Sequence, residues 1–219
     1  MFHHIHPYPP YIPETATKLI VGTLPPPRFT TGELKERDVD FCYGSGDGQL
    51  WVILDRIFDL KLKFETTAEA IAQREHFLIS RGIGVCDMVA SAKREKVDAS
   101  DIGMQEVELR DLVAVLQQHS KIDTLLFTGG NSKNGPEYFF RRNLKSYNIK
   151  MNLISSEPPR IHTFVLPDNG RTIKTVSLIA PSGSANRAVG SLATYKKMKA
   201  ENPDFSVIDF RVAQYKPFF

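Results

Sequence analysis

The run Thr175-Val176-Ser177-Leu178-Ile179-Ala180 passes directly into Pro181-Ser182-Gly183-Ser184-Ala185-Asn186-Arg187, and this junction decides the predicted fold. The first half is apolar and β-branched, as in a buried strand, and the second half is a loop of small residues. A similar junction joins Leu19-Ile20-Val21 to Gly22-Thr23-Leu24-Pro25. Open α/β sheets build their ligand sites where strands end in such loops. Small residues there let the backbone approach a phosphate group, and a following helix presents its free N–H groups.

The composition is that of an ordinary folded domain. The chain has 219 residues, of which 42% are hydrophobic and 24% are charged, as is typical of a soluble globular protein. Its net charge of +3 allows a polyanionic partner without requiring one. Cys42 and Cys86 form no Cys-x-x-Cys pair, so neither an iron–sulfur cluster nor a disulfide framework is expected. The sequence predicts no membrane span and no signal peptide, and we expect a cytoplasmic protein.

Residues 1–15 are expected to form an extended arm on the domain, because their prolines exclude helix and central strand. These prolines are Pro7, Pro9, Pro10 and Pro13. Three histidines in the arm, His3, His4 and His6, could suggest a metal site. They have no acidic or cysteine partner nearby, and structural metal sites need ligands at fixed geometry. We therefore expect no metal and a packed or solvated arm.

Strands and helices alternate along the rest of the chain. The predicted strands are Lys18–Thr23, Gly84–Met88, Ile122–Phe127, Asn152–Ser155, and the hairpin His162–Leu166 and Arg171–Ala180. The predicted helices are Asp47–Leu60, Thr66–Arg81, Val107–His119, Pro136–Tyr147 and Arg187–Ala200. The aromatic tail Phe205–Phe219 is expected to pack on the body. This alternation predicts a single α/β domain over residues 1–219, a three-layer α/β/α sandwich with a mostly parallel central sheet.

Capping residues mark two of the predicted helices. Ser45 or Asp47 is placed to cap the helix at 47–60. Thr66 or Thr67 is placed to cap the helix at 66–81, and Gly82 is a natural stop at its end.

Three predicted strands end in loops of small and polar residues. The loops are Gly22-Thr23-Leu24-Pro25, Thr128-Gly129-Gly130-Asn131, and the segment from Pro181 to Arg187. The carboxyl ends of parallel strands lie along one edge of a sheet, so the three loops are expected to form one crevice. The alternative is that they are only tight turns, since Gly and Pro end strands everywhere. The neighbouring run Phe41-Cys42-Tyr43-Gly44-Ser45-Gly46-Asp47 favours a binding cleft.

The order of five motifs resembles the uracil-DNA glycosylase superfamily, especially its mismatch-specific and hypoxanthine-type branches, over most of the chain. The motifs are Gly22-Thr23-Leu24-Pro25-Pro26, the stretch from Tyr43 to Trp51, the strand from Gly82 to Ser91, Phe127-Thr128-Gly129, and the segment from Pro181 to Arg187. The resemblance implies the uracil-DNA glycosylase fold. It also implies an enzyme that flips a base out of the DNA stack before cutting it.

The resemblance assigns two groups of site residues. The base pocket would contain Thr23, Leu24, Pro25, Tyr43, Ser45, Thr128 and Gly129. The DNA backbone would contact Ser182, Gly183, Ser184, Asn186 and Arg187. Tyr43 matches the ring that stacks on the flipped base, and its alternative role is that of a core aromatic.

Four positions depart from the family pattern. Leu24 stands where the mismatch-specific branch has the Asn that orients the attacking water. Ser45 and Gly48 stand where the hypoxanthine-type branch has its own Asn. Thr128 replaces the Asn that reads the base edge, so the choice of base does not carry over.

Asp47 is the only carboxylate in the segment that matches the second motif, and it is the predicted catalytic residue. A carboxylate there could orient a water molecule and stabilise an oxocarbenium-like sugar. The same position suits a plain helix cap, and Asp40 is an alternative carboxylate.

The sequence therefore predicts a monomeric DNA glycosylase without metal or organic cofactor. Its reaction would be hydrolysis of the N-glycosidic bond of a deaminated or mismatched base in damaged or mismatched DNA. The alternative is a catalytically altered or inactive DNA- or nucleotide-binding protein on the same fold, as Leu24 suggests. An unrelated α/β hydrolase is disfavoured, because the chain has no Gly-x-Ser-x-Gly elbow and Ser182 has no evident His partner.

Overall fold

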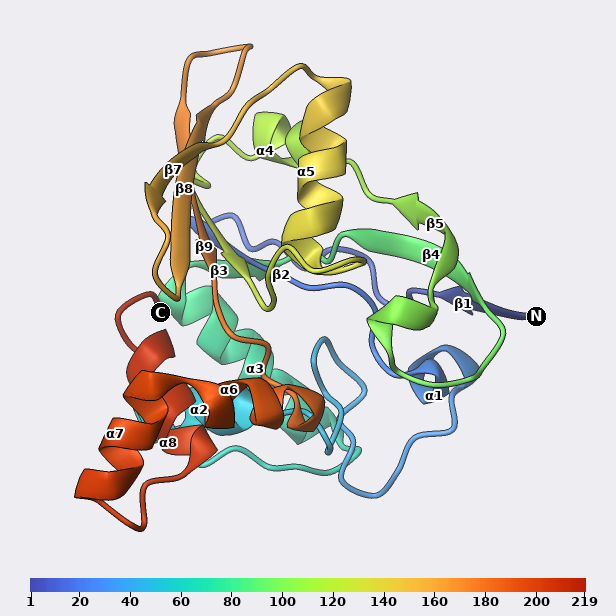
Figure 1. Ribbon diagram of the computed structural model, residues 1–219. Coiled ribbons are helices and arrows are strands. Elements are labelled where there is room, and N and C mark those ends of the chain that lie inside the picture. The colour runs from blue at the N-terminus through green and yellow to red at the C-terminus, as the bar shows by residue number, and fades with distance from the viewer.

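A six-stranded sheet forms the centre of the molecule (Figure 1). The computed structural model describes residues 1–219. Across the sheet the strands are β3 (Ile83–Val85), β2 (Lys18–Val21), β6 (Thr124–Phe127), β9 (Thr172–Ser177), β8 (Arg160–Val165) and β7 (Asn152–Ser155). The first four are parallel, whereas β8 and β7 are antiparallel to their neighbours. The sheet is thus mostly parallel, as predicted, and the predicted hairpin forms β8 and β9.

Successive residues of the central strands pack into two different hydrophobic clusters. In β2, Leu19 and Val21 belong to one hydrophobic cluster and Ile20 belongs to another. In β6, Leu125 and Phe127 follow the first pattern and Leu126 the second. Successive side chains of a strand point to opposite faces, so the sheet is buried on both sides.

Helices cover both faces of this sheet (Figure 1). The first face carries α4 (Leu112–Gln118) and α5 (Pro136–Ser146), which contribute buried leucines and phenylalanines to the first cluster. The second face carries α2 (Leu50–Phe58), α3 (Ala68–Arg81) and α8 (Val207–Tyr215). The architecture is a three-layer α/β/α sandwich, which confirms the predicted fold class.

A small antiparallel sheet, which the sequence did not predict, lies beside the main one. Its order is β1 (Phe2–Ile5), β4 (Val89–Arg94) and β5 (Gln105–Leu109). The N-terminal arm is extended and contributes β1 as an edge strand. The short 3₁₀ helix η1 (Asp101–Gly103) lies between β4 and β5. The predicted helix at 107–119 began too early, because α4 starts only after Asp111, whose side chain accepts a hydrogen bond from the Ala114 N–H.

The predicted caps have mixed outcomes. Thr67 caps α3 by accepting from the Ala70 N–H, and Gly82 ends the helix in a left-handed conformation, as predicted. The predicted cap of α2 by Ser45 or Asp47 is wrong. That helix begins at Leu50 after Gln49, with no side-chain cap. The reason is that Gly48 forms a β-bridge with Ser182, and the Gln49 N–H donates to the Pro181 carbonyl.

The remaining helices lie around the main sheet. They are α1 (Pro27–Thr31), η2 (Gly183–Ala185), α6 (Asn186–Ser191) and α7 (Ala193–Glu201). The helix predicted at 187–200 is two helices, because Leu192 has extended backbone dihedrals. The C-terminal tail forms α8 and packs on the body, as expected. None of the helices combines the length and apolar character needed to cross a bilayer.

Candidate active site

The three predicted loops converge on one cavity at the carboxyl ends of β2, β6 and β9. Thr23, Thr128 and Ser182 all line it, with Tyr43 in its wall. Its volume is about 790 Å³, within the usual range for small-ligand sites. The cavity therefore lies where an open α/β sheet builds its ligand site.

Most of the predicted site residues reach this cavity. Those that line it are Thr23, Leu24, Pro25, Tyr43, Ser45, Asp47, Thr128, Ser182, Gly183 and Ser184. Gly129 is buried, and a Cβ added there would lie 3.0 Å from Pro136 Cδ, away from the cavity. Asn186 and Arg187 begin α6 next to the Ser184 side of the cavity without lining it.

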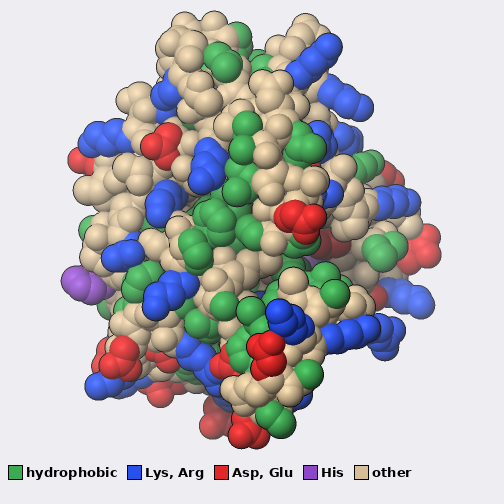
Figure 2. Space-filling model, turned by 60° about the vertical axis from the view of Figure 1, so that its left-hand side comes forward, with side chains coloured by type: hydrophobic (Ala, Val, Ile, Leu, Met, Phe, Trp, Pro, Cys, Tyr) green, Lys and Arg blue, Asp and Glu red, His purple; other side chains and the backbone are tan.

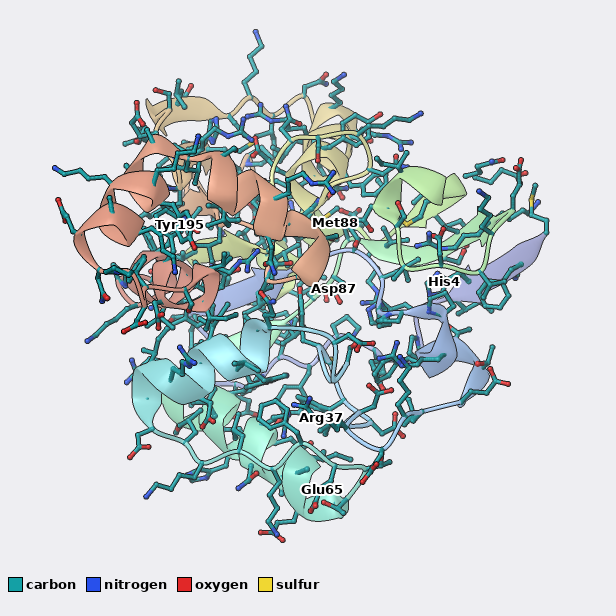
Figure 3. All side chains as sticks on the ribbon, turned by 60° about the horizontal axis from the view of Figure 1, so that its bottom comes forward. His4, Arg37, Glu65, Asp87, Met88 and Tyr195 are labelled. Atoms are coloured by element: carbon teal, nitrogen blue, oxygen red, sulfur yellow. The ribbon has the colours of Figure 1, made fainter.

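Asp87 is a buried carboxylate in the cavity wall, and sequence reasoning gave it no role. Its Oδ1 accepts hydrogen bonds from the Gly22 N–H at 2.6 Å and the Tyr43 hydroxyl at 2.7 Å. Its Oδ2 lies 3.0 Å from His6 Nε2. Asp87 lies near the middle of the molecule, where the main sheet, the small sheet and the helices meet (Figure 3). Three donors from three segments thus fix the orientation of this carboxylate.

The tautomer of His6 follows from its second contact. The Tyr8 backbone N–H donates to His6 Nδ1 at 3.2 Å, so Nδ1 is the acceptor. The ring proton is then on Nε2, which donates to Asp87. Tyr8 in turn donates its hydroxyl to Asp40 at 2.7 Å. The N-terminal arm thus supplies part of the site, although its histidines were expected only to pack or to face solvent.

Tyr43 has a strained backbone in this site. Its φ of 57° is in the left-handed region, which costs a non-glycine residue about 1 kcal/mol or more. Burial raises the pKa of its phenol well above 10.0, and the nearby Asp87 raises it further. The neutral hydroxyl therefore remains a donor to Asp87. Strain of this kind collects at functional sites, where the surrounding contacts hold it.

Asp47 lies at the mouth of the cavity. Its side chain is 69% exposed and forms ion pairs with Arg28 at 3.2 Å and Lys35 at 3.1 Å. Arg28 also forms a closer pair with Asp38, at 2.6 Å and 2.8 Å. Asp47 is therefore a solvated carboxylate between two cations, in contrast to the enclosed Asp87.

The cavity lining is strongly acidic. It includes Asp47, Asp87, Asp98 and Asp101, and no lysine or arginine. Cations instead lie on the outer surface, where Lys and Arg side chains are spread over the face that carries β7, β8 and the C-terminal helices (Figure 2). Like charges focused in a low-dielectric cleft favour a positive charge inside it and oppose a phosphate group.

Arg211 of α8 holds the rim of the cavity, and sequence reasoning missed it. The side chain is completely buried. It donates to Gln49 Oε1, to Asn186 Oδ1 at 2.8 Å and to the Ser182 carbonyl at 3.1 Å. One guanidinium thus joins the loop before α2, the loop after β9 and the start of α6. The tail is mostly apolar and aromatic in sequence, and a single arginine within it gives no sign that its side chain is buried.

The arm histidines have protein partners. His4 Nδ1 accepts from Arg94 Nε at 2.8 Å, whereas His6 contacts Asp87. Burial, helped by the nearby Arg94 charge, lowers the pKa of His4 to about 4. No group of three or more His, Cys, Asp or Glu side chains has the geometry of a metal site.

Comparison with known proteins supports the fold. No family model and no curated protein sequence matches the chain. The solution NMR structure of "a putative Uracil DNA glycosylase" from Methanosarcina acetivorans is similar, with a TM-score of 0.54 and 15% sequence identity. The match covers 96% of this chain and 99% of the other. The chain thus has the fold of that uracil-DNA-glycosylase-like structure along almost its whole length.

Proposed function

We propose that this protein is a DNA glycosylase that hydrolyses the N-glycosidic bond of a deaminated or mismatched base. The observation that carries the proposal is the acidic cavity, in which Asp87 is oriented by Gly22, Tyr43 and His6. The similar fold of the Methanosarcina structure supports the same class of reaction.

The charge of the cavity suits this chemistry. Breaking a glycosidic bond develops positive charge on the sugar, and carboxylates stabilise it. Oδ2 of Asp87 accepts only the His6 hydrogen bond, so it retains a lone pair for a water molecule. In the proposal Asp87 orients that water for attack on C1′ and accepts its proton. The position of Leu24, where the mismatch-specific branch has an Asn, then need not supply the water-orienting group.

DNA is the proposed partner, and its phosphates would remain outside the acidic cavity. The loop Ser182–Ser184 and Arg187 would contact the backbone, while the flipped base enters beside Tyr43 and Thr128. Arg187 is exposed and forms no ion pair with the protein, so its charge is available. We propose that the protein acts as a monomer without a cofactor.

The second candidate is a protein that binds DNA or a nucleotide without cutting it. Leu24 favours it, because an apolar side chain in the cavity wall cannot orient water. The absence of lysine and arginine from the lining argues against a nucleotide with its phosphates inside.

The test is a panel of oligonucleotides that contain uracil, hypoxanthine, xanthine or a mismatch, treated with alkali after incubation. Excision of one member, reduced about a hundredfold or more by Asp87→Asn, supports the proposal. Asn keeps the size of the side chain but not its charge, and thermal unfolding of the variant checks its fold. Binding without any excision by the wild-type protein would favour the second candidate.

A further inference from the structure

A second carboxylate enters the same cavity from the small sheet. Asp101 begins the 3₁₀ helix η1 and lines the cavity together with Asp87. Its Oδ1 accepts a hydrogen bond from the Thr23 hydroxyl at 2.8 Å. Thr23 directly follows Gly22, whose N–H donates to Asp87. The two carboxylates therefore flank the turn that ends β2.

Two buried polar side chains hold η1 in position. Nδ2 of Asn134 donates to the Asp101 carbonyl at 2.8 Å and to the Met104 carbonyl at 3.1 Å. Arg94, 1% exposed, donates to the Ser100 carbonyl. The Asn134 and Arg94 side chains belong to segments outside η1, so both ends of this short helix, and Asp101 with them, are held in position.

The two carboxylates have unequal partners. Asp87 accepts hydrogen bonds from three donors. Asp101 accepts one side-chain hydrogen bond, on Oδ1. Its Oδ2 has no hydrogen-bond partner and is not among the buried unpartnered side-chain atoms, so it is accessible to solvent, and Asp101 itself lines the cavity.

We propose that Asp101 is the proton donor to the departing base, with Asp87 as the carboxylate that accepts the proton of the water; this inference rests on the proposed function. As the C1′–N bond breaks, its electron pair passes to the base, and the proton on Asp101 Oδ2 moves to that base. The water oxygen bonds to C1′, and its proton passes to Asp87. One water is consumed, a free base and an abasic sugar are formed, and proton exchange with solvent resets both carboxyls.

The surroundings of Asp101 favour this assignment. Burial raises the pKa of its carboxyl to about 6, whereas the Thr23 hydroxyl and the Arg94 charge oppose the rise and the Asp87 charge adds to it. The exposed Asp98 is the other carboxylate of this connection that lines the cavity. A carboxyl whose surroundings raise its pKa is suited to the role of general acid.

The experiment measures single-turnover excision from about pH 5 to pH 8. The wild-type rate should fall above about pH 6, approaching tenfold per pH unit, as Asp101 ionises. Asp101→Asn should be about a hundredfold slower or more, without this fall. Thr23→Val removes a donor to the ionised form, so the fall should move to higher pH. Glu95→Gln is the matched control, because it removes an exposed charge from the same β4–β5 connection outside the cavity.

A leaving-group comparison separates proton donation from a structural role. Replacing uracil by 5-fluorouracil in the oligonucleotide makes the base a better leaving group. The defect of Asp101→Asn should then shrink, because less protonation is needed. An equal defect on both bases, an unchanged pH profile or a rate within a few-fold of wild type would overturn the assignment while leaving the proposed function intact. If the wild-type protein excises no base, the proposed function fails and this inference fails with it.

Discussion

Replacing Gly22 by Ala should disrupt the centre of the cavity. A Cβ added to Gly22 would lie 2.4 Å from the Tyr43 hydroxyl oxygen, and 2.9 Å from both Asp87 Oδ1 and Thr128 Oγ1. None of these atoms can move away freely. The Tyr43 hydroxyl is hydrogen-bonded to the Asp87 carboxylate, and the Thr128 hydroxyl is hydrogen-bonded to the Val21 carbonyl. The added methyl group must therefore break the contacts that orient Asp87.

The magnitude follows from two costs. Overpacking a filled site costs about 1–3 kcal/mol, and losing a hydrogen bond to a charged group costs about 1.5–3 kcal/mol. The two costs involve the same atoms and do not add fully, so we expect Gly22→Ala to lower the free energy of unfolding by about 2–5 kcal/mol. Excision should be lost as well, because Asp87 no longer has a fixed orientation.

Urea unfolding monitored by Trp51 fluorescence measures this change. The midpoint should fall by about 1–2 M, given a slope of about 2–3 kcal/mol per molar urea for a chain of this size. Gly190→Ala is the matched control, because the same methyl group would meet no atom within 4 Å. It lies in α6 and should change stability by less than about 1 kcal/mol. A Gly22→Ala protein that unfolds at the wild-type midpoint would refute the packing argument.

Two further predictions concern the surface of the site. Asp47→Asn should change the free energy of unfolding by less than about 1 kcal/mol, because exposed ion pairs contribute little. The excision rate should stay within a few-fold of wild type if Asp87 orients the water. A loss of about a hundredfold would instead support Asp47 as the catalytic carboxylate. Arg187→Ala should weaken DNA binding about evenly across sequences and reduce the slope of log affinity against log salt by about one. Fluorescence anisotropy at several salt concentrations measures both effects. An unchanged affinity would contradict the assignment of this loop to the DNA backbone.

The sequence predicted the main sheet because its strands are short, continuous apolar runs. Leu19-Ile20-Val21 and Leu125-Leu126-Phe127 are buried on both faces, and such strands stand out without any tertiary information. The small sheet could not be predicted in this way. Its strand β4 contains Lys93 and Arg94, and the buried Arg94 donates a hydrogen bond to His4 of β1, 90 residues away in sequence. Partners so distant leave no local pattern.

Part of the site could be predicted from the loops that follow parallel strands, and part could not. Thr23, Thr128 and Ser182 were predicted to meet because each follows a parallel strand. The rule applied equally to Asp87, which follows β3 after one residue, and it could have identified that carboxylate. Asp101 and Arg211 come from the small sheet and the C-terminal helix. Their approach to the cavity depends on long-range packing that the local sequence does not encode.

The raised pKa of Asp101 should make the free energy of unfolding depend on pH. The pKa of Asp101 is raised by burial from 3.8 to about 6, so the folded state binds this proton more tightly than the unfolded chain does. The contribution of this bound proton to the free energy of unfolding is complete below about pH 4 and is lost as the pH rises through about 6. The total change is about 3 kcal/mol. Asn at this position carries no charge at either pH. Asp101→Asn should therefore gain about 3 kcal/mol relative to wild type between about pH 4 and pH 8, whereas Glu95→Gln should show no such trend. Urea unfolding at both pH values measures the difference, and a difference that does not vary with pH would show that this carboxyl is not held protonated by its surroundings.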